Sequence, residues 1–282
     1  MDTMKLNNGK TIPSVGFGVF LVENNGPCEQ AVTNALQAGY RLIDTAAAYF
    51  NETDVGKAVK KSGIPREEIY ITSKLWLQDY GYEAAKKGID ASLQKLGLDY
   101  MDLYLLHQPY GDTAGAWKAL EEAVRAGKIK SIGVSNHTVK LLSKLIPQME
   151  ILPAVNQMEC NPFFQQKELR KYMDQFGIRL EAWYPLGHAD KALLTDPRLV
   201  KIAEKYGKTV AQVILRWHLQ EGIVAIPKAT SMEHIKENLD LYSFMLTDYE
   251  MAEIRSMDKG VGSHDPEDMG NADRLGALKV HD

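Results

Sequence analysis

The sequence predicts an α/β fold, a closed (β/α)8 TIM barrel with an N-terminal β-hairpin cap and extra helices. Short runs of β-branched and apolar residues alternate eight times with stretches of helical periodicity, the pattern of a parallel sheet covered by helices. The ends of these runs lie 22 to 44 residues apart, near the length of one strand with its helix. Because 282 residues suffice for one barrel, we expect a single domain over residues 1–282.

The first predicted element is the hairpin. Residues 4–6 and 11–12 flank the sequence Asn7-Asn8-Gly9. An Asn-Gly pair tolerates the positive φ angles that a type I′ turn requires. These residues are therefore expected to form a tight hairpin that caps the barrel.

Eight strands are predicted after the hairpin, at residues 15–19, 42–44, 69–72, 102–106, 132–134, 154–157, 179–182 and 224–226. Helices are expected between them. Ala85, Ile89, Leu93 and Leu96 form one amphipathic stripe, and the long interval 187–224 predicts an extra helix. Helix starts are indicated by Asp196 before Pro197 and by the capping-box pairs Thr209–Gln212, Thr230–Glu233 and Thr247–Glu250.

The competing architecture is an open, doubly wound sheet with a glycine fingerprint after its first strand. Gly16 and Gly18 are the available candidates, but the third glycine is missing at the required spacing and no helical pattern begins there. These glycines are better explained by close packing at a strand end.

Composition narrows the possible partners and the compartment. The chain is 45% hydrophobic and 25% charged with a net charge of −4, which disfavours disorder and gives no basic excess for binding nucleic acid. Cys28 and Cys160 are the two cysteines, too few for a disulfide scaffold. The chain contains no signal peptide or membrane-spanning run, so we expect a cytoplasmic protein without membrane contact, and a monomer.

Polar side chains follow several predicted strands. In a closed barrel these positions meet at one mouth, where catalytic groups gather. Asp44, Lys74 and His107 occupy such positions, and Tyr49 lies five residues after Asp44. Further polar or aromatic groups at strand ends are Ser135, Asn136, Gln157 and Trp183.

The first four residues suit proton delivery. A tyrosine with a pKa of ~10 is a weak acid, but a nearby ammonium such as that of Lys74 would lower this value. Asp44 would hold the lysine, and His107 would donate a hydrogen bond to a carbonyl oxygen. Each residue also has an ordinary structural explanation: Asp44 as a helix cap or loop acceptor, His107 as a satisfied structural residue and Tyr49 as a packed ring.

Other catalytic motifs are missing from the sequence. The seven histidines form no HExxH or HxH pattern, so no metal site is predicted. The sequence also lacks a GxSxG elbow and a P-loop.

Several motifs in chain order resemble those of the aldo-keto reductase superfamily. They are Asp-Thr-Ala at 44–46 with Tyr49, then residues 71–76, 102–107, 133–136 and 226–228. Residues 181–183 and 185–187 are most similar to the microbial reductases that include 2,5-diketo-gluconate reductase.

This resemblance implies an NADPH-dependent enzyme that reduces aldehydes or ketones. Asp44, Tyr49, Lys74 and His107 would be catalytic, with Tyr49 giving the proton. The coenzyme would be bound by Ser135, Asn136 and Gln157 at the carboxamide, by Trp183 stacked on the nicotinamide, and by Lys228, Ala229, Thr230, His234, Glu237 and Asn238 at the other end. The substrate would contact Val19, Phe20, Trp76 and Gln108, and the tail 259–282 would fold over the active site.

Three positions, in two segments, depart from the family pattern. Gln108 replaces a frequent tryptophan, which predicts a more polar pocket suited to small polar carbonyl compounds. Ala229 and His234 replace the usual serine and arginine beside the 2′-phosphate. NADPH remains the expected coenzyme. The replacements at 229 and 234 predict that NADH can also be used.

Two alternatives stay open at this point. Lys74 could form a Schiff base as in barrel aldolases, although Asp44 would keep it protonated. The chain could also be a catalytically weak, cofactor-binding regulatory or structural relative.

Overall fold

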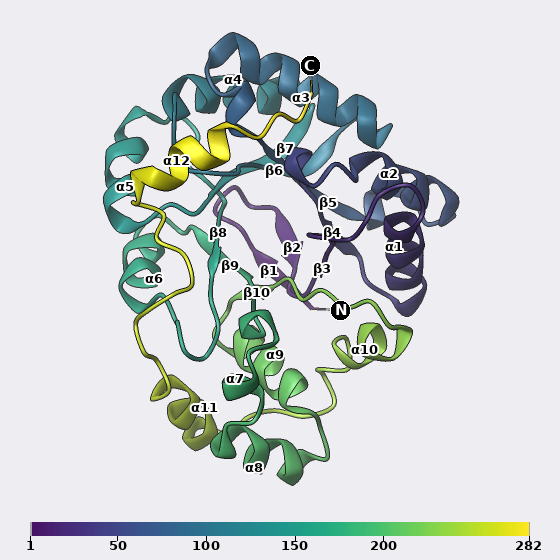
Figure 1. Cartoon of the computed structure of the whole chain (residues 1–282), viewed down its shortest axis with the longest axis vertical. Helices are drawn as coiled ribbons and strands as arrows, with labels where there is room; N and C mark the ends of the chain where they lie inside the picture. Colours follow the sequence, from purple (N-terminus) through teal and green to yellow (C-terminus); the bar gives the residue numbers. More distant parts are fainter. Residues whose placement is uncertain (1, 282) are drawn as a thin grey trace.

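The computed structural model describes residues 2–281, and within them eight parallel strands follow one another in sheet order from β3 to β10 (Figure 1). A parallel bridge between Val15 and Ala225, with the Gly16 N–H donating to the Ala225 carbonyl at 2.9 Å, joins the two ends of the sheet. The predicted barrel is confirmed. The strands are β3 (Phe17–Gly18), β4 (Leu42–Asp44), β5 (Tyr70–Leu75), β6 (Met101–Leu106), β7 (Ile129–Ser135), β8 (Val155–Glu159), β9 (Arg179–Trp183) and β10 (Val224–Ala225).

Helices surround this sheet and bury their apolar stripes against it (Figure 1). The stripe that includes Ala85 and Ile89 lies on α3, as expected. The interval 187–224 contains α7 and α8 before α9. The helices are α1 (Pro27–Ala38), α2 (Glu52–Lys61), α3 (Tyr82–Leu96), α4 (Thr113–Arg125), α5 (Val139–Leu145), α6 (Lys167–Asp174), α7 (Lys191–Leu194), α8 (Pro197–Tyr206), α9 (Val210–Gln220), α10 (Met232–Glu237), α11 (Asp248–Arg255) and α12 (Met269–Gly276).

The hairpin of β1 (Thr3–Lys5) and β2 (Thr11–Pro13) closes the N-terminal end of the barrel. Leu6 and Ile12 are buried in one apolar cluster with residues of β4, β6, β8 and β10. The Arg179 guanidinium at the start of β9 donates to the Lys5 carbonyl. Ligands must therefore approach from the other end, where the strands finish.

The turn of this hairpin differs from the prediction. Lys5 pairs with Thr11, and of the three turn residues only Gly9 has a positive φ, 81°. A type I′ turn would need two such residues. The loop is longer because its side chains bind the barrel: Asn7 donates to the Pro153 carbonyl, and Asn8 donates to the Ser131 hydroxyl.

One further expectation needs correction. The predicted cap Thr230 lies outside α10, whose first turn is capped by the Ser231 hydroxyl accepting from the His234 N–H. The tail contains the helix α12, capped by Asp268. The caps at Asp196, Thr209 and Thr247 are confirmed.

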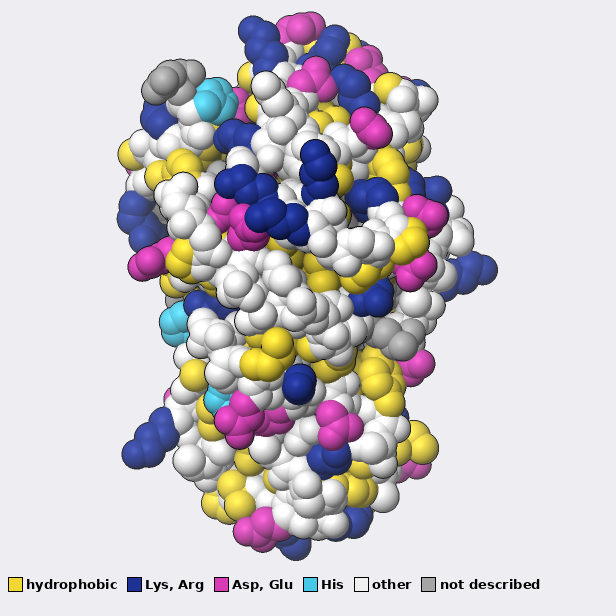
Figure 2. Space-filling view, turned by 90° about the vertical axis from the view of Figure 1, so that its right-hand side faces the viewer, with side chains coloured by type: hydrophobic (Ala, Val, Ile, Leu, Met, Phe, Trp, Pro, Cys, Tyr) yellow, Lys and Arg dark blue, Asp and Glu magenta, His cyan; other side chains and the backbone are white. Residues whose placement is uncertain are grey.

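The surface carries charges of both signs. Figure 2 shows Lys, Arg, Asp and Glu side chains interspersed on the side of the molecule where α1, α2 and α10 lie in Figure 1. Within residues 2–281, no helix combines the length and apolar character needed to cross a membrane.

Candidate active site

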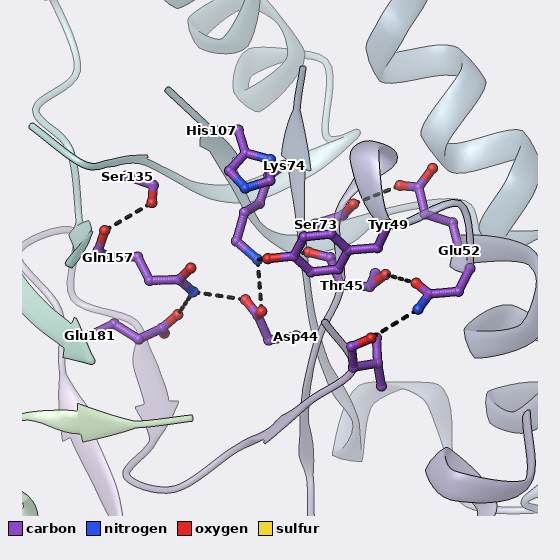
Figure 3. Close-up of polar contacts among 12 residues, drawn as sticks. Asp44, Thr45, Tyr49, Glu52, Ser73, Lys74, His107, Ser135, Gln157 and Glu181 are labelled. Carbon is purple, nitrogen blue, oxygen red and sulfur yellow. Dashed lines mark hydrogen bonds and ion pairs between the residues drawn. The ribbon is translucent and has the colours of Figure 1, made fainter. Parts of the chain in front are cut away.

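A buried ion pair joins β4 to β5 at the mouth of the barrel. Lys74 Nζ lies 2.7 Å from Asp44 Oδ1 and 2.9 Å from the Thr45 carbonyl (Figure 3). The Tyr49 hydroxyl, on the short 3-10 helix η1 (Ala47–Tyr49), lies 3.3 Å from the same Nζ. Lys74 is 0% exposed, so its three donors meet a carboxylate, a carbonyl and a phenol in place of water.

His107 follows β6 and faces Tyr49 across the mouth. Its ring centroid lies 5.6 Å from that of Tyr49 and 5.0 Å from that of Trp76, both edge-on. Its Nδ1 is buried and meets no hydrogen-bond partner in the described part of the chain. The structure thus brings together the four residues that the sequence proposed as catalytic.

The charges of this group follow from burial and from Asp44. Complete burial disfavours the Lys74 ammonium, but the charge of Asp44 and the hydrogen bond to it, together with Tyr49 and Glu181, outweigh that cost and raise the pKa of Lys74. Burial also places the pKa of His107 well below its usual value, and Lys74 lowers it further, so this imidazole is neutral at pH 7.

The expected lowering of the Tyr49 pKa is wrong in this structure. Burial raises the pKa of Tyr49, and the opposing effect of the Lys74 charge does not overcome it. The phenol is therefore protonated at neutral pH and has a proton to give.

A second carboxyl lies behind the ion pair. Gln157, on β8, donates from Nε2 to Asp44 Oδ2 at 2.8 Å and also to Oε1 of Glu181, on β9 (Figure 3). Glu181 is fully buried, and its Oε2 has no hydrogen-bond partner among residues 2–281. Burial, with the negative charge of Asp44, raises the pKa of Glu181 to about 8.

Three other predicted residues lie beside this group. Asn136 adopts a left-handed conformation with φ of 62°, and its side chain donates to the His107 carbonyl at 3.1 Å. Its oxygen accepts from Trp183 Nε1 at 3.0 Å, which fixes the half-buried indole. The Ser135 hydroxyl donates to the Gln157 carbonyl at 2.9 Å.

These side chains line a cavity of about 770 Å³. Phe20, Trp76 and Gln108 also line it, as expected for substrate contacts. Val19 does not: its side chain is fully buried in the main core. The tail contributes Ser263, His264, Arg274, Leu275 and Leu278.

The residues expected at the 2′-phosphate are only partly joined to this cavity. Lys228 lines it and is exposed, whereas Ala229 is buried and Thr230 is exposed beyond the cavity lining. His234 Nδ1 lies 3.1 Å from Glu237 Oε2, a contact that the sequence did not predict. The remaining residue of this set, Asn238, is buried at the end of α10.

Among residues 2–281, no group of three or more His, Cys, Asp and Glu side chains is arranged to hold a metal ion.

Comparison with known proteins identifies the family. A model described as "Aldo/keto reductase family" matches residues 28–259. The chain belongs to this family.

Individual relatives agree in sequence and in fold. Glyoxal reductase of Bacillus subtilis (strain 168) is 49% identical over 262 residues, covering 92% of this chain and 93% of the relative. A crystal structure of an aldo/keto reductase from Brucella melitensis has 46% identity and a TM-score of 0.88, with 91% and 99% of the two chains covered. A crystal structure of the Bombyx mori aldo-keto reductase in complex with NADP has 35% identity and a TM-score of 0.88, with 96% and 97% covered.

Some residues of this aldo/keto reductase site were not singled out from sequence. Glu181 was visible as a charged residue inside a predicted buried strand, a signal that could have marked it. His264 and Arg274 come from the tail, where no apolar periodicity indicated which side chains face inward.

Proposed function

We propose that this aldo/keto reductase reduces small aldehydes or ketones to alcohols, with NADPH as hydride donor and Tyr49 as proton donor. The observation that carries the proposal is the contact chain from Asp44 through Lys74 to Tyr49, beside a neutral His107 and at the wall of a cavity. The name of the Bacillus subtilis relative, glyoxal reductase, supports a small carbonyl substrate.

The residues around the cavity fit a nicotinamide coenzyme. The half-buried Trp183 indole, held by Asn136, offers an aromatic face to the cavity. Because both neighbours of Gln157 Nε2 are carboxyl groups, its carbonyl oxygen is the end left to accept from a ligand amide. Ser135, Asn136, Gln157 and Trp183 would hold the nicotinamide, and Lys228 would face the phosphates. The complex of the Bombyx mori relative with NADP supports this assignment.

When bound, the coenzyme supplies a hydride, the electron pair that reduces the carbonyl carbon. The Tyr49 hydroxyl gives its proton to the carbonyl oxygen as the C=O π bond breaks, so one C–H and one O–H bond form. Lys74, 3.3 Å away, stabilises the phenolate that remains until solvent returns a proton. The His107 imidazole, neutral because of burial, can donate an N–H to the same oxygen.

The Schiff-base alternative is disfavoured by the surroundings of Lys74. A nucleophilic lysine must lose its proton, but Asp44 raises the pKa of Lys74 and the side chain is fully buried. A purely regulatory role gives no reason for a protonated phenol beside a buried ammonium.

The test is the substitution Tyr49→Phe. We expect kcat for glyoxal reduction to fall by ~10²-fold or more, because the transferable proton is removed. The Kd for NADPH, measured by fluorescence titration, should change by less than about threefold because the ring remains.

The control is Tyr249→Phe, which removes a phenol hydroxyl from the exposed Tyr249 on α11. Turnover by Tyr49→Phe at a rate close to wild type would refute the assignment of the proton donor.

A further inference from the structure

The charged side chains that line the cavity are unequal in sign. Among the described lining residues, Asp44 is the one carboxylate, and it is 4% exposed and paired with Lys74. The exposed charges are those of Lys228 and Arg274, both positive. The charged groups that a molecule in this cavity can touch directly are therefore these two cations.

The two cations lie on opposite walls. Lys228 follows β10, whereas the catalytic His107 follows β6, four strands away in the order of the eight-stranded barrel. Arg274 belongs to the His107 side: its neighbour Leu275 packs in one cluster with Trp76, whose indole contacts the His107 ring. Lys228 serves the coenzyme in the proposed function, which leaves Arg274 as the exposed lining cation on the His107 side of the cavity.

The Arg274 guanidinium has donors to spare. Its Nη2 donates to Asn271 Oδ1 at 2.9 Å, and it forms no ion pair with any carboxylate in the described chain. A guanidinium carries five N–H donors in a planar fork that matches a carboxylate.

Further polar groups line the same cavity. The Gln108 oxygen faces the Asn136 amide at 3.5 Å, so its NH₂ group is the end left for a ligand. His264 Nε2 is buried without a partner among residues 2–281. One guanidinium with an amide donor beside it suits a singly charged group better than a doubly charged phosphate.

We infer that the preferred substrates are carbonyl compounds bearing a carboxylate and that Arg274 binds this carboxylate while the carbonyl lies at Tyr49 and His107. This inference rests on the proposed function, because it names the substrate class of the same reaction. Arg274 is a specificity-determining residue and does not take part in proton transfer.

The test compares 4-carboxybenzaldehyde with methyl 4-formylbenzoate, which differ mainly in charge. The variants are Arg274→Gln and a matched control, Lys279→Gln, which removes one exposed positive charge from the same tail without changing the cavity lining. We expect the ratio of kcat/KM for acid over ester to fall roughly tenfold in Arg274→Gln, in line with loss of a charge-assisted hydrogen bond at a partly exposed site. Arg274→Lys should retain part of the ratio, and Lys279→Gln should retain all of it.

A second measurement does not depend on turnover. Tryptophan fluorescence titration gives Kd values for 4-methylbenzoate and 4-methylbenzamide, and the wild type should prefer the carboxylate while Arg274→Gln should not. If the wild type reduces neither aldehyde but keeps this preference, the proposed function fails and the carboxylate site stands. An unchanged acid-to-ester ratio in Arg274→Gln, or an equal fall in Lys279→Gln, would overturn the inference.

Discussion

Glu181 places a second buried carboxyl near the Lys74 ammonium, which already forms an ion pair with Asp44. Asp44 takes the ion pair with Lys74, and Gln157 bridges the two acids with one amide nitrogen. The titratable groups that face Glu181 are Asp44, Lys74 and the buried phenol of Tyr70. Holding a proton on Glu181 at neutral pH avoids a second uncompensated buried charge.

This protonation should appear in the pH dependence of stability. The pKa of Glu181 is about 8 in the folded chain and near 4.5 when unfolded, so the folded state binds the extra proton between these values. The free energy of unfolding should therefore fall as pH rises from 5 to 8, by up to ~1.4 kcal/mol per pH unit for one proton. Glu181→Gln should remove this contribution, as measured by urea unfolding from pH 5.5 to 8.5.

Other groups also titrate in this range, so the quantity to compare is the difference between variant and wild type. Glu168→Gln, at an exposed position on α6, is the matched control and should show a difference that is flat with pH. A flat difference for Glu181→Gln as well would mean that Glu181 is ionised in the folded chain.

At the scale of single residues, position was easier to predict than charge. Asp44, Lys74 and His107 could be placed at one mouth because parallel strands end on the same side of a barrel. The direction in which the Tyr49 pKa shifts could not be predicted, because it depends on how much water the fold removes from the phenol. Val19 shows the same limit: neighbouring positions near a strand end alternate between core and cavity, and the register decides between them.

At the scale of elements, α10 carries two of the residues that we propose for the 2′-phosphate of the coenzyme, His234 and Glu237. Glu237, at the end of this helix, accepts from His234 and from the Thr209 hydroxyl. The Glu237 carboxylate would repel a 2′-phosphate, and a permanent positive charge at position 234 would offset this repulsion.

Replacing His234 with Arg should therefore favour NADPH. We expect the ratio of Kd for NADH over NADPH to rise about fivefold or more in His234→Arg, because a guanidinium remains charged at all working pH values. NADH lacks the 2′-phosphate and serves as the internal control. A ratio that is unchanged in His234→Arg would show that the phosphate is held away from this position.

The boundaries of elements were predicted less well than their existence. Thr230 and Ser231 are consecutive and both can cap a helix, so spacing alone could not choose between them. At the hairpin, the Asn-Gly pair favoured a two-residue turn. The loop is longer because the Asn7 and Asn8 side chains donate hydrogen bonds to Pro153 and Ser131. Long-range contacts of this kind leave no local signal.

At the scale of the whole molecule, the tail is a strap held at several points. Glu267 accepts from Thr138 and pairs with Lys140. Near the end of the chain, the Trp76 indole donates to the Leu278 carbonyl at 3.0 Å. His281 Nε2 lies 2.7 Å from the Asp79 carboxylate, at the end of the short 3-10 helix η3 (Leu77–Asp79).

Removing residues 259–282 should separate substrate binding from coenzyme binding. We expect KM for 4-carboxybenzaldehyde to rise tenfold or more, because the cavity loses five lining residues including Arg274. The Kd for NADPH should change less than about threefold, since Trp183 and Lys228 remain. Circular dichroism establishes that the shortened chain is folded.

A milder variant covers the case in which the truncated chain does not fold. Val280→Asp places a charge in the apolar cluster of Val280, Ala47 and Trp76 and should loosen the strap alone. Loss of NADPH binding together with substrate binding, in either variant, would contradict this division of roles.

The barrel and the tail also differ in how far sequence could predict them. The helices of the barrel could be predicted because each buries an apolar stripe against the sheet, which gives its sequence a helical periodicity. In α12 no side chain is fully buried, and Leu275 packs only partly buried against the cluster of Trp76, so the helix shows little apolar periodicity. Its place over the cavity comes from separate contacts such as that between the Tyr110 hydroxyl and the Asp268 carbonyl.

The hairpin that closes the N-terminal end of the barrel also determines where a tag or linker can be attached to this enzyme. Its strands lie at the end opposite the cavity, whereas Val280 and His281 are engaged beside the mouth. A purification handle or a linker to a solid support placed ahead of Thr3 therefore leaves the mouth accessible. The same attachment at the other terminus would pull on the strap and disturb the cavity that it helps to line.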